Sequence, residues 1–408
     1  MYKQDNLLVG LFGLFLGSIL LLRVMIGAPA IGRDESYIFL QTHWLATSIN
    51  ALPEILFVLL PVVLGMACLK LFLSLLARYK VTNKKKYLST LFFALSPVVI
   101  TTFTTYNETM IVSVLALTSL VVPRTLASIP LLLLSATSPL AGILVALVLA
   151  AQFIHEKQLV ATATLLGPVL LGAILYDTTR VFSWVGLFGE FASIKGYSLF
   201  LLLLGVVALV EHWNKLNLAP IIAWSILFVV SGFVVELRVL LIIPLAVYAS
   251  QSLVTFFTNE WTLGFLRQAS IILLACVALF VLITHTQLLV NEQPGRDVAA
   301  LVEFIEESSR QGTLLTTQGV SGYTEYSLSR EVITFSSDDR FWEEVRLTTV
   351  GPVLTRHDVR YLLFEQRFRE KGFFFLLTTN DKFIRVSQEG DYELWLVLQE
   401  YVPSEEEP

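Results

Sequence analysis

The chain has 408 residues, of which 55% are hydrophobic and only 15% are charged, and its mean hydropathy is +0.72. Soluble domains carry roughly 25% charged residues, so this balance excludes an ordinary soluble protein and indicates a polytopic α-helical membrane protein. The net charge of −5 hides a division, because residues 1–290 carry 16 basic and 11 acidic side chains whereas residues 291–408 carry 12 and 22. We therefore expect a transmembrane module over 1–290, a water-exposed acidic domain over 291–403 and a disordered acidic tail over 404–408.

Apolar runs of spanning length follow one another along the transmembrane module. The first run has no small-residue cleavage site, so we expect a retained helix and not a removed signal peptide. The runs cover 7–26, 55–77, 88–105, 109–123, 159–176, 198–211, 218–235, 239–258 and 269–290.

A further apolar run, 126–153, is interrupted at residues 135–139, which include Ser138 and Pro139. A straight helix of that length would reach about 42 Å, well beyond the ~30 Å hydrocarbon core. We therefore expect two short helices that meet at the interruption, either as two spans or as a re-entrant pair. With them, the module has about eleven membrane segments.

Orientation follows from the loop after the second run, where basic residues gather and predict a cytoplasmic location. Asp34 then faces outside, as do Glu108, Arg238, residues 177–197 and everything after residue 290. If 126–153 crossed the membrane only once, every later loop would change sides. The expected location is the cytoplasmic (plasma) membrane, with the C-terminal domain outside. The basic residues in the loop after the second run are Arg78, Lys80, Lys84, Lys85 and Lys86.

The C-terminal domain changes from long apolar runs to short alternating ones. Apolar residues recur at helical spacing in 296–309, at Val298, Leu301, Val302 and Ile305. The alternation of short runs predicts a small α/β domain with a largely parallel sheet and a final hairpin. Strands are expected at 313–317, 332–335, 359–364, 383–387 and 392–398, and helical pieces at 323–328, 341–345 and 366–377.

Several common sites are absent from the sequence. It contains no phosphate-binding glycine loop and no metalloprotease helix motif, and its five histidines are scattered. Cys68 and Cys276 lie inside apolar runs and form no metal-type spacing. We expect no cofactor and no nucleic-acid partner; a divalent metal stays possible without support from any motif.

The first candidate site is the acidic pair Asp34-Glu35, which follows Arg33 between two apolar runs. Carboxylates beside a membrane interface favour acid–base chemistry. The pair also suits the N-terminus of an amphipathic helix that begins at Ser36, and both roles are compatible.

Two later segments place a charged side chain next to the end of an apolar run. Glu108 follows Tyr106 and Asn107 and stands almost at the start of an apolar helix; the alternative is a loop carboxylate in water. Arg238 follows Glu236, with a proline six residues later, and a fixed guanidinium can bind phosphate through two hydrogen bonds. The alternative is a polar turn in which Glu236 and Arg238 pair with each other.

An acidic pair lies in the first outer loop, a Tyr-Asn-Glu-Thr segment opens the fourth span, and a Glu-x-Arg segment opens a late span. This order of motifs resembles the GT-C superfamily of membrane glycosyltransferases. The layout is most similar to the protein O-mannosyltransferase, aminoarabinose transferase and GPI mannosyltransferase branches. The interrupted run and the C-terminal extracytoplasmic domain also fit this family. The resemblance covers the whole chain in layout, although each motif is short.

The resemblance implies an inverting, metal-independent transfer of a sugar from a polyprenyl-phosphate donor, such as a dolichyl phosphate, to a lipid, glycan or protein acceptor at the outer membrane face. It assigns Asp34 as the general base and Glu35 as an orienting or sugar-contacting group. Glu108 and Tyr106 would line the opposite wall, and Arg238 would bind the donor phosphate. Weaker donor-binding candidates are Glu236, Lys195 and Tyr197.

Two other functions remain open. A lipid or sugar transporter would be expected to carry ionisable residues in the middle of its spans, where this chain has almost none. A non-catalytic scaffold would bind a partner through its outer domain, and it predicts that Asp34→Asn and Glu108→Gln leave function unchanged.

Overall fold

A computed structural model describes most of the helices and strands of the chain. It describes residues 2–26, 28, 37, 54–123, 126–155, 166–175, 196–211, 225, 227–234, 236–258, 264–290, 295–308, 312–317, 319–328, 330–335, 354, 357–366 and 382–398. Contacts divide the chain into two compact units. The helical unit comprises Met1–Leu20 and Glu54–Val290, and the C-terminal unit comprises Leu21–Pro53 and Asn291–Pro408. The predicted division into a transmembrane module over 1–290 and a C-terminal domain over 291–403 stays a prediction.

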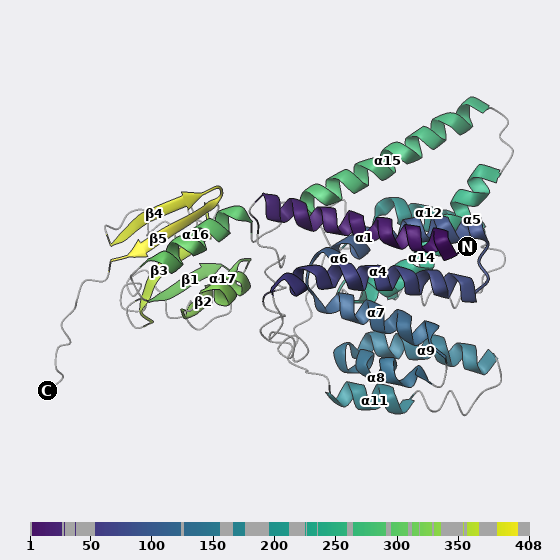
Figure 1. Ribbon diagram of the computed structural model, residues 1–408, viewed down its shortest axis with the longest axis horizontal. Coiled ribbons are helices and arrows are strands. Elements are labelled where there is room, and N and C mark those ends of the chain that lie inside the picture. Colours follow the sequence, from purple (N-terminus) through teal and green to yellow (C-terminus); the bar gives the residue numbers. More distant parts are fainter. Residues whose placement is uncertain are drawn as a thin grey trace. The chain divides into compact units, whose positions relative to one another are not determined.

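The helical unit is built from apolar helices joined by shorter connections (Figure 1). Their bounds are α1 Tyr2–Met25, α4 Glu54–Arg78, α5 Asn83–Ala94, α6 Pro97–Thr104, α7 Glu108–Val121, α8 Ser128–Thr137, α9 Pro139–His155, α11 Leu166–Leu175, α12 Leu199–Glu211, α14 Glu236–Thr258 and α15 Gly264–Val290.

The length and composition of these helices indicate a membrane-embedded protein. Among the described residues, four segments are long and apolar enough to cross a membrane, and the bent pair α5–α6 makes a fifth. The helices α7, α8 and α9 are apolar but shorter. Large apolar side chains such as Leu14, Leu147 and Phe280 are exposed on the helices, as lipid-facing residues are. The four segments are Gln4–Met25, Leu59–Arg78, Glu236–Thr258 and Gln268–Leu288.

The run 88–105, expected as one helix, is broken. Helix α5 ends at Ala94, α6 begins at Pro97, and the two are bent by 57°. Proline lacks a backbone N–H and its ring clashes with the preceding turn of a helix, so the break occurs at Ser96-Pro97. Length and hydropathy alone did not show this bend.

The interruption in 126–153 produces two helices, as the sequence predicts. Helix α8 ends at Thr137 and α9 begins at Pro139. A Cβ atom on Gly142 would lie 2.9 Å from Cα of Ser135. In one continuous helix, residues seven apart are about 10.5 Å apart along the axis. The chain therefore reverses at Ser138, and α9 folds back against α8.

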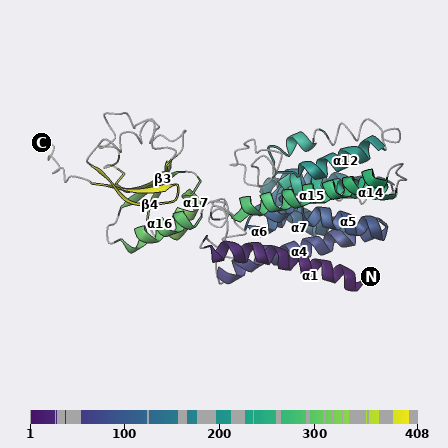
Figure 2. The ribbon, with the colours of Figure 1, turned by 90° about the horizontal axis from the view of Figure 1, so that it is seen from above.

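Close packing joins helices that are distant in sequence. A Cβ atom on Gly65 of α4 would lie 3.0 Å from Cβ of Phe103 on α6, so the missing side chain allows these helices to approach closely. Ser89 on α5 and Ser250 on α14 share a 2.7 Å hydrogen bond between their hydroxyl groups. Figure 2 shows α12 and α14 side by side, and Ser252 Oγ donates to the carbonyl oxygen of Leu204 at 2.8 Å.

The predicted cytoplasmic loop forms one end of this unit, which we call the basic end. Lys84 is exposed, but Lys86 is only 1% exposed, and its Nζ lies 2.8 Å from Oδ2 of Asp5. Tyr87 donates to Gln4 at 2.8 Å. One of the basic residues counted for orientation therefore joins α5 to the start of α1 instead of facing solvent.

The C-terminal unit contains a sheet of five described strands with the order β2-β1-β3-β5-β4. β1 is parallel to β2 and β3, whereas β5 is antiparallel to β3 and β4. The sheet is therefore mixed and not largely parallel, because the final hairpin adds to its edge. That hairpin turns at Gly390, whose φ of 51° suits glycine. The elements are α16 Arg296–Glu307, β1 Thr313–Thr317, α17 Ser321–Ser327, β2 Val332–Phe335, β3 Val359–Glu365, β4 Phe383–Glu389 and β5 Tyr392–Val397.

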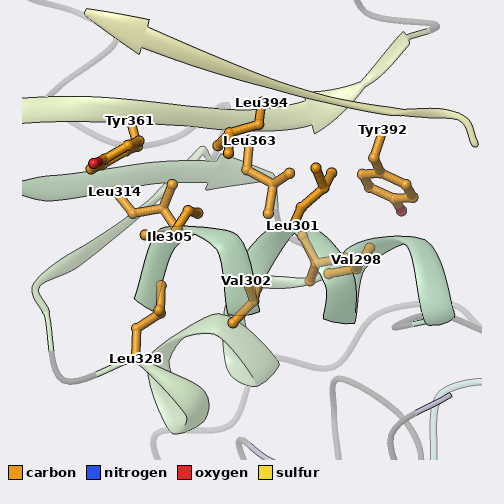
Figure 3. Close-up of a cluster of buried hydrophobic side chains, with 11 residues drawn as sticks. Val298, Leu301, Val302, Ile305, Leu314, Leu328, Tyr361, Leu363, Tyr392 and Leu394 are labelled. Atoms are coloured by element: carbon orange, nitrogen blue, oxygen red, sulfur yellow. The ribbon is translucent and has the colours of Figure 1, made fainter. Parts of the chain in front are cut away.

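Helix α16 packs one face on this sheet. The four residues predicted at helical spacing, from Val298 to Ile305, are all buried against Leu314, Leu363 and Leu394 of the strands (Figure 3). Helix α17 and the strands lie where the sequence indicates, within one or two residues. The predicted helical pieces at 341–345 and 366–377 lie outside the described residues, except for Gln366.

Candidate functional site

The structure describes five of the eight predicted site residues. Asp34, Glu35 and Lys195 lie outside the described residues, so the predictions about them stay predictions. The other five are Tyr106, Glu108, Tyr197, Glu236 and Arg238.

The connection between α6 and α7 holds Glu108 at the first position of a helix. Asn107 is the N-cap residue: its Oδ1 accepts a 3.0 Å hydrogen bond from the backbone N–H of Met110. Its Nδ2 donates to the carbonyl oxygens of Thr102 and Thr105, at 3.1 and 3.0 Å. The oxygen and the nitrogen of the Asn107 side-chain amide therefore both make hydrogen bonds that fix this turn.

Burial at this turn excludes the alternative of a carboxylate in water. Glu108 is 8% exposed and Tyr106 is 1% exposed. The start of α7 carries the partial positive charge of the helix dipole, which favours a carboxylate there. Glu108 is therefore a buried acid at the N-terminus of its own helix.

A second group of polar residues surrounds the start of α14. Arg238 is fully buried, at 0% exposure, and its Nε donates to the carbonyl oxygen of Ser231 at 2.8 Å. The hydroxyl of Ser231 donates to the carbonyl oxygen of Phe228 at 2.6 Å and accepts a 3.0 Å hydrogen bond from the hydroxyl of Tyr197. The Tyr197 ring stacks on Phe228, with centroids 5.2 Å apart. Ser231 therefore links Tyr197 to Arg238.

Ser231 was not singled out from the sequence. The run 218–235 is predicted as one span, but its described part ends in a turn at residues 231–233, before Val234. The adjacent Ser231-Gly232 pair is a sequence signal for such a turn. No sequence signal shows that the Ser231 carbonyl accepts from a side chain, because every residue has a carbonyl.

The two groups lie toward the same end of the helical unit. Helix α14 packs on α5, α6 and α7, and it runs opposite to α5 and α6 (Figure 1). From the level of the Ser89–Ser250 contact, Arg238 is about 18 Å back along α14, and α5 and α6 lead from Ser89 toward the same end across their 57° bend. We call the end that holds Tyr106, Glu108, Tyr197, Ser231 and Arg238 the polar end.

Burial reinforces the protonated state of the two tyrosines of the polar end, which lie in connections outside the helices. It raises the pKa of the Tyr106 phenol and that of the Tyr197 phenol. Both hydroxyl groups therefore keep their protons near neutral pH and can donate hydrogen bonds. Glu236 is half-buried, two residues before Arg238 in the first turn of α14.

The guanidinium of Arg238 is a hydrogen-bond donor of the kind that binds anions. Within the described ranges, no group of three His, Cys, Asp or Glu residues is placed to hold a metal ion. Arg238 is held by its Nε, and Tyr197 and Glu236 interact with it electrostatically; a fixed guanidinium can bind phosphate through hydrogen bonds. No protein-family model matches the chain, and the curated proteins contain no match to it either.

Proposed function

We propose that the chain is an inverting membrane glycosyltransferase of the GT-C type, which transfers a sugar from a polyprenyl-phosphate donor to a lipid, glycan or protein hydroxyl. In this proposal the membrane module has about eleven segments, including the short helices α7, α8 and α9. The basic end faces the cytoplasm of a plasma membrane, and the polar end and the C-terminal unit face outside.

The observation that carries the proposal is the burial of Arg238 in an apolar helical unit. A guanidinium inside a membrane protein is costly to place and marks a functional site by default. The backbone carbonyl of Ser231 fixes its orientation, so the group is preorganised for a ligand. A planar cation of fixed orientation suits the phosphate of a lipid-linked sugar.

The proposed reaction is a single displacement at the anomeric carbon. Asp34 accepts the proton of the acceptor hydroxyl while the acceptor oxygen forms a bond to that carbon. The bond between the anomeric carbon and the phosphate oxygen breaks, and its electron pair leaves with the polyprenyl phosphate. Arg238 stabilises the extra negative charge on that phosphate, and the anomeric configuration is inverted.

The remaining residues support this displacement. Glu35 orients the first outer loop, and Glu108 and Tyr106 contact the sugar from the start of α7. Tyr197 donates its hydroxyl to Ser231, so we assign it the support of the turn that carries Arg238. Lys195 and Glu236 are secondary candidates for contact with the donor.

A transfer assay with purified protein tests the proposal. The protein in lipid nanodiscs is given a panel of polyprenyl-phosphate hexoses and pentoses with a membrane lipid extract as acceptor source, and release of polyprenyl phosphate is measured. We expect Asp34→Asn to reduce release by about 100-fold or more, whereas Glu303→Gln, an exposed carboxylate on α16, leaves it unchanged.

Two results would contradict the proposal. Full activity of both Asp34→Asn and Glu108→Gln would favour a non-catalytic scaffold, and movement of intact donor across the bilayer without product would favour a transporter. Cysteine labelling in intact cells gives a separate check, because a cysteine at position 34 and one at position 233, which is 46% exposed and lies five residues before the buried Arg238, must react from the same side.

A further inference from the structure

Among the side chains of helix α15 that the structure describes, only that of His285 is buried, at 3% exposure. Its ring atom Nε2 lies 3.1 Å from the hydroxyl oxygen of Thr101 on α6, so a hydrogen bond joins the two helices. One turn earlier, Leu282 packs against a cluster that includes Ile100, the neighbour of Thr101. The last turns of α15 therefore meet α6, whereas apolar residues such as Phe280 are exposed.

Two roles are open to a buried histidine in an apolar helix. It can join helices, as hydroxyl, amide and imidazole side chains do inside membrane proteins. It can also serve a functional site, because an ionisable side chain in a membrane segment is costly and marks such sites by default. The hydrogen bonds that Thr101 makes on its other side favour the second role.

Thr101 lies in the last turn of α6, where the carbonyl groups have no partner within the helix. A side chain supplies the missing donor, because the carbonyl oxygen of Thr101 accepts a 2.9 Å hydrogen bond from the hydroxyl of Thr105. The same hydroxyl accepts a 2.8 Å hydrogen bond from Nδ2 of Asn107. Thr105 therefore links the end of α6 to the turn that follows it.

This series of hydrogen bonds ends beside Glu108. Asn107 is the N-cap residue of α7, and Glu108 is the first residue of that helix. The hydroxyl of Thr101 meets His285 and its carbonyl meets Thr105, so Thr101 connects α15 to the turn that holds Glu108. All these residues belong to the helical unit.

We infer that His285 is a positioning residue for Glu108, which it reaches through Thr101, Thr105 and Asn107. The hydrogen bond at Nε2 fixes the end of α6, and the end of α6 fixes the N-cap of α7. The kinetic consequence rests on the proposed function, in which Glu108 contacts the sugar. A displacement of about 1 Å at a reacting group can reduce the rate about 100-fold, and we expect less here because the displacement passes through three residues.

The first test measures the attachment without activity. Hydrogen–deuterium exchange of the full-length protein in nanodiscs reports on the backbone N–H groups at the start of α7, including that of Met110, which donates to Asn107 at 3.0 Å. We expect His285→Leu to accelerate this exchange several-fold. His285→Gln should leave it as in the wild type, because the glutamine amide nitrogen takes the place of Nε2. Thr286→Val is the matched control and should not change the exchange, since the Thr286 hydroxyl donates within its own helix, to Leu282 at 2.8 Å.

The second test measures transfer. We expect His285→Leu to lower kcat about 10-fold, His285→Gln to stay within about twofold of wild type, and Thr286→Val to have no effect. Thr101→Val, which keeps the shape of threonine, is the second variant and should resemble His285→Leu. In a Glu108→Gln background, His285→Leu should cause no further loss of kcat, because a residue that acts only through Glu108 then has no carboxylate to position.

The outcomes separate the positioning role from the proposed function. Unchanged exchange in both His285→Leu and Thr101→Val overturns the positioning role and leaves the proposed function standing. Exchange that rises as much in α12 as at the start of α7 also overturns it, because it reports a general loss of stability. So does a loss of kcat in His285→Leu that multiplies with the loss in Glu108→Gln. Exchange that rises only around α6 and α7, in a protein whose wild type transfers no sugar, supports the attachment and overturns the proposed function.

Discussion

The helical unit buries one cation at its basic end and another at its polar end, and the two differ in the groups that accept their hydrogen bonds. Lys86 at the basic end is 1% exposed and forms a 2.8 Å ion pair with Asp5. Arg238 at the polar end is 0% exposed and gives its Nε to a backbone carbonyl at 2.8 Å. A carboxylate neutralises the Lys86 ammonium directly, whereas the hydrogen bond that orients the Arg238 guanidinium goes to a neutral carbonyl, with Glu236 and Tyr197 interacting with it electrostatically.

Burial alone therefore does not separate a structural cation from a ligand-binding one, and the atoms that each cation contacts have to be compared. Lys86 joins two helices by neutralisation, as structural ion pairs do. Arg238 donates its Nε to a neutral acceptor and also interacts electrostatically with Glu236 and Tyr197; under the proposed function this arrangement orients the guanidinium toward an anionic ligand. Four predictions test this contrast, beginning with the largest expected effect.

Replacement of Arg238 by glutamine should remove the cation from the polar end and lower kcat/KM for sugar transfer about 100- to 1,000-fold. Arg78→Gln is the matched control, because Arg78 also donates to a backbone carbonyl, that of Leu120, at 2.8 Å. The control should stay within about twofold of wild type. Retention of most activity by Arg238→Gln would remove the functional distinction between the two ends.

Replacement of Lys86 by methionine should lower stability and leave kcat unchanged. The expected loss in free energy of unfolding is about 2 kcal/mol, less than for a fully enclosed pair because the Asp5 side chain is 25% exposed. Thermal unfolding in detergent measures it. The double variant Asp5→Asn/Lys86→Met should recover most of the loss; a double variant as unstable as the single one would contradict neutralisation as the role of the pair.

Replacement of Asn107 by alanine should cost about 1 kcal/mol of stability, the typical value of an N-cap. It should also reduce transfer, because the turn that fixes Glu108 loses both sets of hydrogen bonds. Asn107→Asp keeps the acceptor for Met110 N–H but not the amide donors, so its effect should be intermediate. An aspartate variant as impaired as the alanine variant would show that the donors to Thr102 and Thr105 dominate.

Replacement of Tyr197 by phenylalanine should have the smallest effect, about 0.5 kcal/mol, because Ser231 keeps its hydrogen bond to Phe228. Donor KM should not change if Tyr197 only supports the turn. A clear rise in donor KM with unchanged stability would instead make Tyr197 a direct ligand of the phosphate, as the sequence resemblance implies.

The sequence predicts the C-terminal unit in more detail than the helical unit. Helix α16 has water on one side, so its apolar residues repeat with helical period and its buried face could be predicted residue by residue. Helix α14 was located within three residues of the expected 239–258. Its buried face could not be predicted, because a helix that meets both lipid and protein is apolar all round.

The site was predictable only where charge marks it. Glu108 and Arg238 are conspicuous because carboxylates and guanidinium groups are rare in apolar runs. Ser231 is not, since its main contribution is a backbone carbonyl whose role depends on a turn. Pro97 is a sequence signal for the bend between α5 and α6, but a prediction from length and hydropathy alone does not use it. The roles of Asp34, Glu35 and Lys195 stay predictions.

The hydrogen bond between Ser89 and Ser250 has a consequence for biosynthesis. Its partners are 161 residues apart in sequence, so at 5–20 residues per second α5 waits roughly 8–30 s for α14 to be made. During that interval each hydroxyl can use a carbonyl of its own helix: Ser89 donates to Lys85 at 2.8 Å and Ser250 to Val247 at 2.7 Å. The early helices can therefore sit in the bilayer without an unsatisfied hydroxyl, and the late helix completes the bundle when it arrives.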